Sequence, residues 1–108
     1  MSEEKSISYV NCPVTNCMNV IGGKWKTIIM YLISLDINRF GIMHRSIEGI
    51  SKQMLTRQLR ELETDGVLKR KIYAEIPPRV EYFLTPKGKT LFPIIQSMKT
   101  WGEEHPGE

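Results

Sequence analysis

The segment from Ser51 to Asp65 combines an apolar stripe with side chains that can bind a polyanion. Leu55, Leu59 and Leu62 follow a spacing of i, i+4 and i+7, which places them on one face of a predicted helix. The opposite face carries the polar and cationic residues Ser51, Lys52, Gln53, Thr56, Arg57 and Arg60. Such groups bond phosphates and base edges. We therefore predict that this helix enters a major groove of DNA; the alternative is a charged helix that only faces solvent.

The residue types along this helix predict which side chains contact bases and which contact phosphates. Gln53 can bond adenine with two hydrogen bonds, and Arg57 can donate to O6 and N7 of guanine. The remaining members, which are Ser51, Lys52, Thr56 and Arg60, are expected to contact phosphates. The sequence does not decide which of the six side chains read bases.

A cationic β-hairpin is predicted directly after this helix. Residues 68–74 alternate as a strand, with Leu68 and Ile72 on the face expected to be buried, and residues 80–84 form the return strand. The cations expected to contact DNA are Lys69, Lys71 and Arg79. Because Arg79 follows Pro77 and Pro78, we expect it at a stiffened tip, where an arginine suits a narrow minor groove. The alternative is an ion pair of Arg79 with Glu75 or Glu81.

Charge is unevenly distributed along the 108 residues, whose net charge is +3. Residues 39–89 hold eleven Lys or Arg against six Asp or Glu, whereas residues 90–108 have a net charge of −2. A positive middle segment is typical of a nucleic-acid binder, although an acidic protein partner would also fit. The chain contains no run of about 18 apolar residues and no signal-peptide pattern, so we expect no membrane span and a cytoplasmic location.

The remaining pattern predicts a mainly α-helical domain over residues 12–108, preceded by a flexible arm at residues 1–11. Further helices are expected at 13–21, 24–35 and 41–47, and a last helix begins at Thr85–Pro86. The helices at 41–47 and 51–65 are joined by a short turn that contains Gly49, which is the helix-turn-helix pattern. Together with the hairpin, these elements predict a winged helix-turn-helix.

The last helix carries more apolar surface than a small monomer needs. Its apolar residues are Leu91, Ile94, Ile95, Met98 and Trp101. We read part of this surface as the interface of a homodimer formed by the N- and C-terminal helices. The alternative is that the helix packs only on its own core.

Cys12 is the residue most suited to redox chemistry. It precedes Pro13 at a predicted helix start, where unpaired N–H groups favour a thiolate that oxidants and electrophiles attack. Cys17 is too far along the chain for a CxxC motif, and either cysteine could instead be a small buried apolar residue. His44 and His105 are isolated, so we predict no catalytic residues, no metal site and no cofactor.

Taken in order, the residues resemble the HxlR family of bacterial transcription regulators over about residues 12–102. The resemblance lies in Cys12–Pro13, Ile21–Trp25, Arg39–Phe40, Gly49–Ser51, Leu55, Leu59–Leu62, Gly66, Pro77–Tyr82, Leu84–Thr85 and Gly88. Departures from the family pattern are Cys17 and the segment that holds Met43 and His44. The resemblance implies a dimeric winged helix-turn-helix, related to the MarR group, that represses or activates promoters at inverted repeats.

The resemblance also implies an effector, because many relatives respond to oxidants, electrophiles or aldehydes through the cysteine that matches Cys12. Two alternatives remain open at this point. One is a winged-helix module that binds a protein partner. The other is a regulator that holds a small apolar molecule between the helix of Trp25 and the helix of Trp101, in which Cys12 is dispensable.

Overall fold

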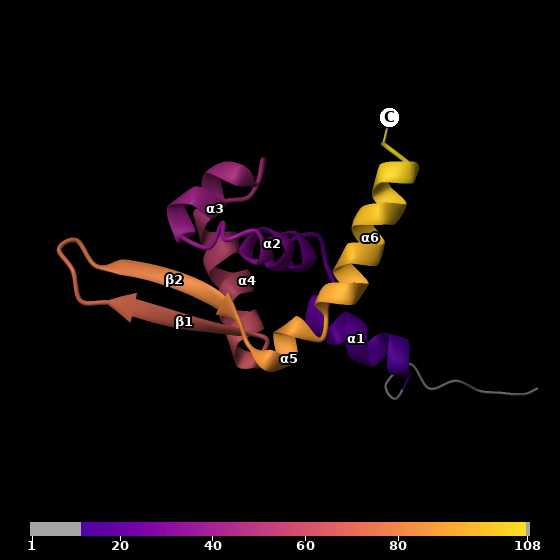
Figure 1. The fold of residues 1–108 in the computed structure, drawn as a ribbon, viewed down its shortest axis with the longest axis horizontal. Coiled ribbons are helices and arrows are strands. Elements are labelled where there is room, and N and C mark those ends of the chain that lie inside the picture. Colours follow the sequence, from indigo (N-terminus) through magenta and orange to yellow (C-terminus); the bar gives the residue numbers. More distant parts are fainter. Residues whose placement is uncertain (1–11, 108) are drawn as a thin grey trace, which may run out of the picture.

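The computed structural model describes residues 12–107 and shows helices around one antiparallel hairpin (Figure 1). The elements in chain order are α1 (Pro13–Ile21), α2 (Lys26–Ser34), α3 (Phe40–Ser46), α4 (Lys52–Thr64), β1 (Leu68–Tyr73), β2 (Arg79–Leu84), α5 (Pro86–Lys89) and α6 (Phe92–Glu104). This confirms the predicted mainly α-helical fold with a small hairpin. The predicted arm at residues 1–11 lies outside the described residues.

Local sequence signals set the starts of α1, α4 and α5, and the end of α4, as predicted. The Ser51 hydroxyl accepts a hydrogen bond from the backbone N–H of Met54 at 3.0 Å, which satisfies a donor that the first turn of α4 leaves free. Thr85 caps α5 in the same way through the N–H of Gly88 at 3.0 Å. Gly66 follows the end of α4 with φ +78°. Glycine adopts this left-handed conformation at little energetic cost because it has no Cβ.

The core joins α2, α3 and α4 to the base of the hairpin. The predicted stripe of α4 is confirmed, because Leu55, Leu59 and Leu62 are at most 1% exposed. The residues that are fully buried beside them are Ile29, Met30, Met43 and Val67. Burying each such side chain stabilises the fold by about 1.5–3 kcal/mol, so this cluster fixes the orientation of α4 against α2.

The hairpin projects away from the helices, and this corrects one sequence prediction (Figure 1). Its register pairs Leu68 with Leu84 at the base and Tyr73 with Arg79 near the tip. Leu68 is buried as expected, but Ile72 is 62% exposed, so its predicted burial is wrong. Alternation alone predicted one apolar face, whereas only the base of the hairpin reaches the core.

Two helix predictions are also corrected. The second helix begins at Lys26 rather than Lys24, and Ile28, which was expected on its buried stripe, is 41% exposed. The last helix is divided into α5 and α6 between Lys89 and Phe92. Pro93 explains the division, because proline has no N–H for the preceding turn and its ring clashes with the carbonyl four residues earlier.

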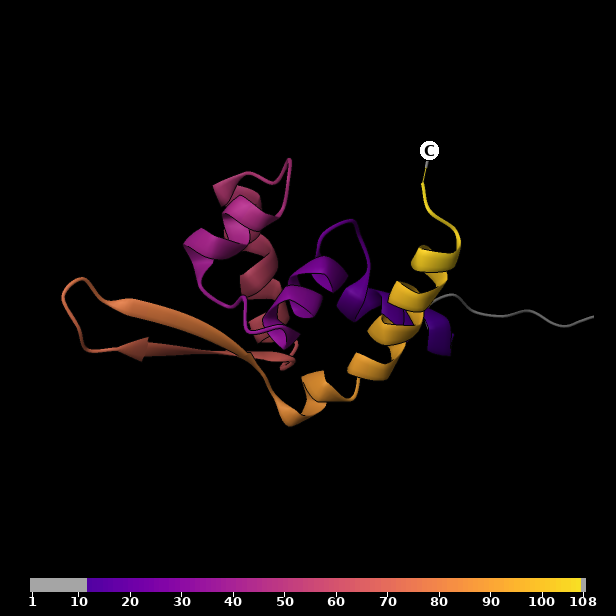
Figure 2. The ribbon, with the colours of Figure 1, turned by 45° about the horizontal axis from the view of Figure 1, so that its top comes forward.

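α1 and α6 lie at the end of the molecule opposite the hairpin in both views (Figures 1 and 2). The predicted dimer contacts on α6 therefore lie apart from the predicted DNA contacts of the hairpin. Within residues 12–107, no helix combines the length and the apolar character that crossing a membrane requires.

Candidate nucleic-acid interface

The exposed face of α4 gathers most of the predicted DNA-binding residues on one concave surface. This surface is a hollow of about 570 Å³ lined by Lys52, Gln53, Thr56, Arg57, Arg60 and Glu61. Ser51 does not line it, because its hydroxyl caps the helix. The Thr56 hydroxyl donates to the carbonyl of Lys52 at 2.9 Å and keeps its lone pairs for further partners. The structure thus brings together five of the six side chains that the sequence indicated on α4.

Glu61 is the member of this surface that the sequence reasoning missed. Its Oε1 lies 2.8 Å from Nζ of Lys26 on α2, and its Oε2 lies 3.3 Å from Nε of Arg57. Lys26, together with the nearby Arg57, lowers the pKa of the Glu61 carboxyl, so the group remains ionised beside the cations. The spacing of Arg57 and Glu61 could have indicated their pair, whereas the link to Lys26 exists only in the folded chain.

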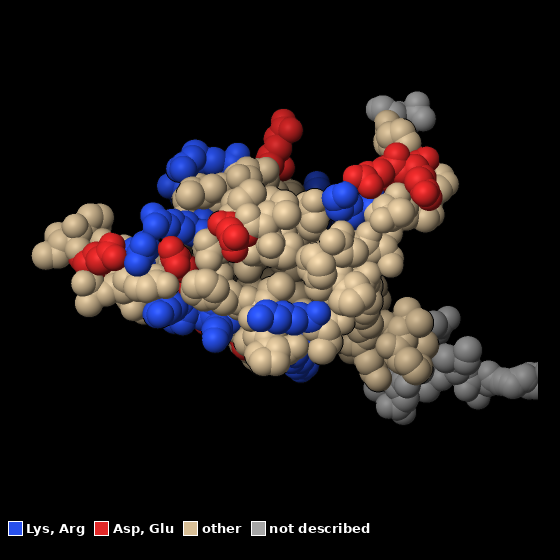
Figure 3. Space-filling view, viewed as in Figure 1, with Lys and Arg blue, Asp and Glu red and all other residues tan. Residues whose placement is uncertain are grey.

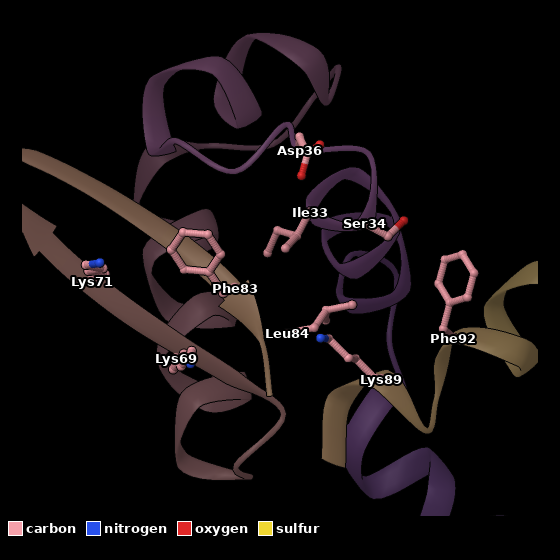
Figure 4. A pocket seen from close by; sticks show the side chains of 9 residues that line it. All are labelled: Ile33, Ser34, Asp36, Lys69, Lys71, Phe83, Leu84, Lys89 and Phe92. Atoms are coloured by element: carbon pink, nitrogen blue, oxygen red, sulfur yellow. The ribbon is translucent and has the colours of Figure 1, made fainter. Parts of the chain in front are cut away.

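Lys69 and Lys71 line a different hollow from the residues of α4. They alternate with Arg70 along β1 and border a hollow of about 680 Å³ with Phe83, Leu84 and Lys89 (Figure 4). Arg70, on the other face of the hairpin, has its Nε 3.8 Å from Oε1 of Glu63 on α4. The two lysines are therefore not part of the α4 surface, and their contact with DNA stays a prediction.

Arg79 is partly enclosed beside the hairpin tip rather than at its end. Its guanidinium lies over the ring of Tyr73, 3.8 Å from the centroid. Nη2 lies 3.2 Å from Glu75, and Nε lies 3.8 Å from Glu81, so both ion pairs considered as the alternative are present. The tip itself is formed by residues 74–78, where the side chain of Ile76 is fully exposed. The predicted tip at Pro77–Pro78 is confirmed, and Arg79 directly follows it as the first residue of β2.

Charge is arranged along the length of the molecule. Lys and Arg side chains gather over the hairpin and α3, with a few acidic side chains among them, whereas acidic side chains cluster near the C-terminal end of α6 (Figure 3). A field of this kind orients a polyanion toward the hairpin end.

Cys12 is the N-cap of α1, as the sequence predicted, and is half-buried. Backbone N–H groups of Thr15 and Val14 lower the pKa of its thiol, because they donate hydrogen bonds that stabilise the thiolate. Cys17, which is also half-buried, packs against the core. Residues 12–107 contain no group of three potential ligands that could hold a metal ion.

The C-terminal helix only partly matches its predicted interface. Ile94, Met98 and Trp101 are 41%, 47% and 63% exposed and share one face of α6. Ile95 is 4% exposed and belongs to the core of its own chain, so its assignment to a dimer interface is corrected. Leu91 precedes α6 and is half-buried against the same core.

The order of α3, a short turn, α4 and a hairpin defines a winged helix-turn-helix protein. The model of the HxlR-like helix-turn-helix family matches residues 20–108. The uncharacterized HTH-type transcriptional regulator YybR of Bacillus subtilis (strain 168) is 49% identical, over 97% of this chain and 86% of that protein.

Solved structures agree with this relationship. The redox regulator HypR in its oxidized form has a TM-score of 0.84 and 48% identity, over 90% of this chain and all of that chain. Its reduced form has a TM-score of 0.79 and 49% identity, over 86% of this chain and 92% of that chain. The chain belongs to the HxlR family and is a DNA-binding transcriptional regulator of that type.

Proposed function

We propose that the protein binds an inverted-repeat operator as a homodimer and inserts one α4 into each of two successive major grooves. The observation that carries this proposal is the exposed α4 face, where Lys52, Gln53, Thr56, Arg57 and Arg60 line one hollow. A major groove admits one helix, and two-fold related helices would then lie about 34–36 Å apart. The hairpin would add contacts from Lys69, Lys71 and Arg79 beside the groove.

Exposed apolar side chains support the dimer. Val14 and Met18 on α1 are 70% and 51% exposed, and Met98 and Trp101 on α6 are similarly open. Both helices lie at the end away from the hairpin (Figure 2). A second copy of the chain would remove this apolar surface from water and leave both hairpins free.

Cys12 supports a response to oxidants or electrophiles. Its pKa is lowered by backbone hydrogen bonds, and the thiolate is the form that reacts. It caps α1, one of the two helices assigned here to the dimer contact, so its modification would change how the subunits are arranged. HypR, which resembles this chain over most of its length, is described as a redox regulator.

Footprinting of the intergenic DNA beside the gene, with purified reduced and diamide-treated protein, tests both parts of the proposal. We expect a protected inverted repeat with reduced protein and an altered pattern after diamide. The Cys12→Ser variant should keep the first pattern under both conditions. Equal diamide sensitivity of the variant and the wild type would remove Cys12 as the sensor, and an absence of protection in all samples would contradict operator binding.

A regulator controlled by a small apolar ligand is the alternative to thiol sensing, and a hollow between α2 and α6 is where such a ligand would bind. Ile28 and Tyr31 of α2 form a hollow of about 250 Å³ with Ile95 and Met98 of α6. A ligand there would change the angle between the two helices. This candidate requires that the Cys12→Ser variant still responds to the effector.

A further inference from the structure

We propose that Glu61 is a positioning residue for DNA recognition: anchored by Lys26 of α2, its carboxylate holds the Nε edge of Arg57 and leaves the two terminal amino groups of Arg57 free to read a base. This inference rests on the proposed function, in which α4 lies in a major groove. It assigns a role in specificity to an acidic residue within a cationic surface.

The two oxygens of Glu61 bind different cations. Oε1 is 2.8 Å from Nζ of Lys26, and Oε2 is 3.3 Å from Nε of Arg57. Lys26 lies in the first turn of α2, so this contact joins two helices, whereas Arg57 lies one turn before Glu61 on α4. Because Lys26 fixes one oxygen from outside the helix, the other oxygen presents a fixed acceptor to Arg57.

Solvent exposure of the side chains increases from Lys26 through Glu61 to Arg57. The side chain of Lys26 is 10% exposed, that of Glu61 is 41% exposed, and that of Arg57 is 71% exposed. A nearly buried ammonium group requires a counter-charge, which Glu61 supplies. An exposed i, i+4 pair with the cation first is the weaker of the two orders and holds a side chain poorly without help. The buried anchor therefore distinguishes this arrangement from an ordinary surface ion pair.

The arrangement leaves Arg57 suited to read guanine. Arginine recognises guanine through two parallel hydrogen bonds, and a correct pair of this type favours the right base by roughly 5- to 150-fold. With Nε engaged by Glu61, the Nη1 and Nη2 groups remain as donors for O6 and N7. The Glu61 charge also repels phosphates, so it lowers affinity for unrelated DNA while it supports discrimination.

The test uses the full chain and a duplex selected from a randomised DNA library by the wild-type protein. Fluorescence anisotropy would then give the affinity for that duplex and for each of its single-base-pair variants. The proteins compared would be the wild type, Arg57→Ala, Glu61→Gln, the double variant, Lys26→Met and Lys26→Arg.

We expect Glu61→Gln to bind unrelated duplexes at least as tightly as the wild type, but to discriminate about tenfold less at the base pair read by Arg57. Lys26→Met should reproduce this loss, because it removes the anchor, and Lys26→Arg should restore most of the discrimination. In the Arg57→Ala background, Glu61→Gln should cause no additional loss, as expected for residues that act through one contact.

Glu63→Gln is the matched control. Glu63 is also an acid on α4, but it lies 3.8 Å from Arg70 of the hairpin and makes no contact with Arg57. Its replacement should leave discrimination at the Arg57 base pair unchanged. A similar loss in Glu63→Gln and Glu61→Gln would show a general charge effect and would overturn the positioning role.

The failure of this inference and that of the proposed function are distinguishable. If Arg57→Ala lowers discrimination and Glu61→Gln does not, the positioning role is wrong and operator binding stands. If Arg57→Ala changes no base preference, the positioning role is overturned, because Arg57 then reads no base. If the wild type binds no duplex, the proposed function fails. In that case ¹⁵N relaxation of the Arg57 Nε–H group tests whether Lys26, through Glu61, restrains the Arg57 side chain. Equal mobility of this group in the wild type and in Lys26→Met would show that it does not.

Discussion

Cys12 shows how one residue can combine a structural role with chemistry. As the N-cap of α1 it has an extended backbone, and Pro13 follows it in the first turn. The same location directs backbone N–H groups toward its sulfur and lowers the pKa of the thiol. The residue therefore ionises more readily than a cysteine in an unfolded chain.

The first prediction concerns the pH dependence of Cys12 alkylation. Because the folded pKa is below that of an ordinary cysteine, the thiolate fraction at neutral pH exceeds that of an unfolded cysteine. In a Cys17→Ser background, the rate of iodoacetamide addition should reach half of its maximum at a lower pH in the folded protein than in the unfolded protein. Mass spectrometry of timed samples gives the rate, and the urea-unfolded protein is the control. A midpoint that does not move on unfolding would contradict the assigned cause.

At the scale of elements, local signals were predictable from the sequence and tertiary contacts were not. The caps of Ser51 and Thr85 and the turn at Gly66 depend on a few neighbouring residues, so the pattern indicates them directly. The exposure of Ile72 depends on how far the hairpin extends beyond the core, which alternation cannot report. Ile95 belongs to the core because α6 packs against α2, and no local pattern contains that contact.

The candidate site divides in the same way. The polar face of α4 was predictable because helical spacing alone brings its side chains together. The separation of Lys69 and Lys71 from that face follows from the direction of β1, which is a property of the assembled chain. The Lys26–Glu61 contact joins residues that are distant in sequence, so single-sequence reasoning had no signal for it.

The second prediction contrasts two apolar residues that the sequence pattern predicted to be buried. Leu59→Ala should lower the free energy of unfolding by about 2–5 kcal/mol, because it leaves a cavity beneath α4. Ile72→Ala should change it by less than about 0.5 kcal/mol, since that side chain is mostly in solvent. Urea unfolding followed by circular dichroism measures both values. Comparable losses in the two variants would mean that the hairpin packs against the helices.

The third prediction concerns the hairpin. Arg79→Ala should weaken DNA binding and reduce the dependence of log affinity on log salt by about one unit, as expected for one lost phosphate contact. It should change base preference little, because Arg79 is expected to contact the backbone and the narrow groove. Lys87→Ala provides a control cation, since Lys87 lies on α5 and its ammonium donates to the carbonyl of Asp65 at 2.9 Å. A strong change in base preference for Arg79→Ala would show that the assignment of the hairpin is wrong.

At the scale of the whole molecule, the surfaces proposed for DNA recognition and for association lie apart from each other. The hairpin, over which Lys and Arg side chains gather, lies away from α1 and α6 (Figures 1 and 3). The apolar side chains Val14 and Met18 of α1 and Met98 and Trp101 of α6 are exposed. α2 connects the two ends, because Ile28 borders the hollow beneath α6 and Lys26 contacts Glu61 of α4. If the subunits associate as proposed, a change in their arrangement would have a direct structural route through α2 to α4.

The last prediction tests whether the apolar face of α6 forms the dimer. Trp101→Glu should shift the protein toward the monomer, because it places a charge on an exposed face that a second copy is proposed to cover. The chain should remain folded, since this side chain is 63% exposed. Sedimentation velocity gives the mass, and circular dichroism checks the fold. Thr100→Glu adds the same charge on a neighbouring exposed residue. Thr100 borders one hollow with Trp101 but lies outside the helical spacing that Ile94, Met98 and Trp101 share, so this variant should remain dimeric. Because a monomer contacts only one half-site, Trp101→Glu should also lose most of its operator affinity. A Trp101→Glu protein that stayed dimeric and bound the operator normally would place the interface elsewhere.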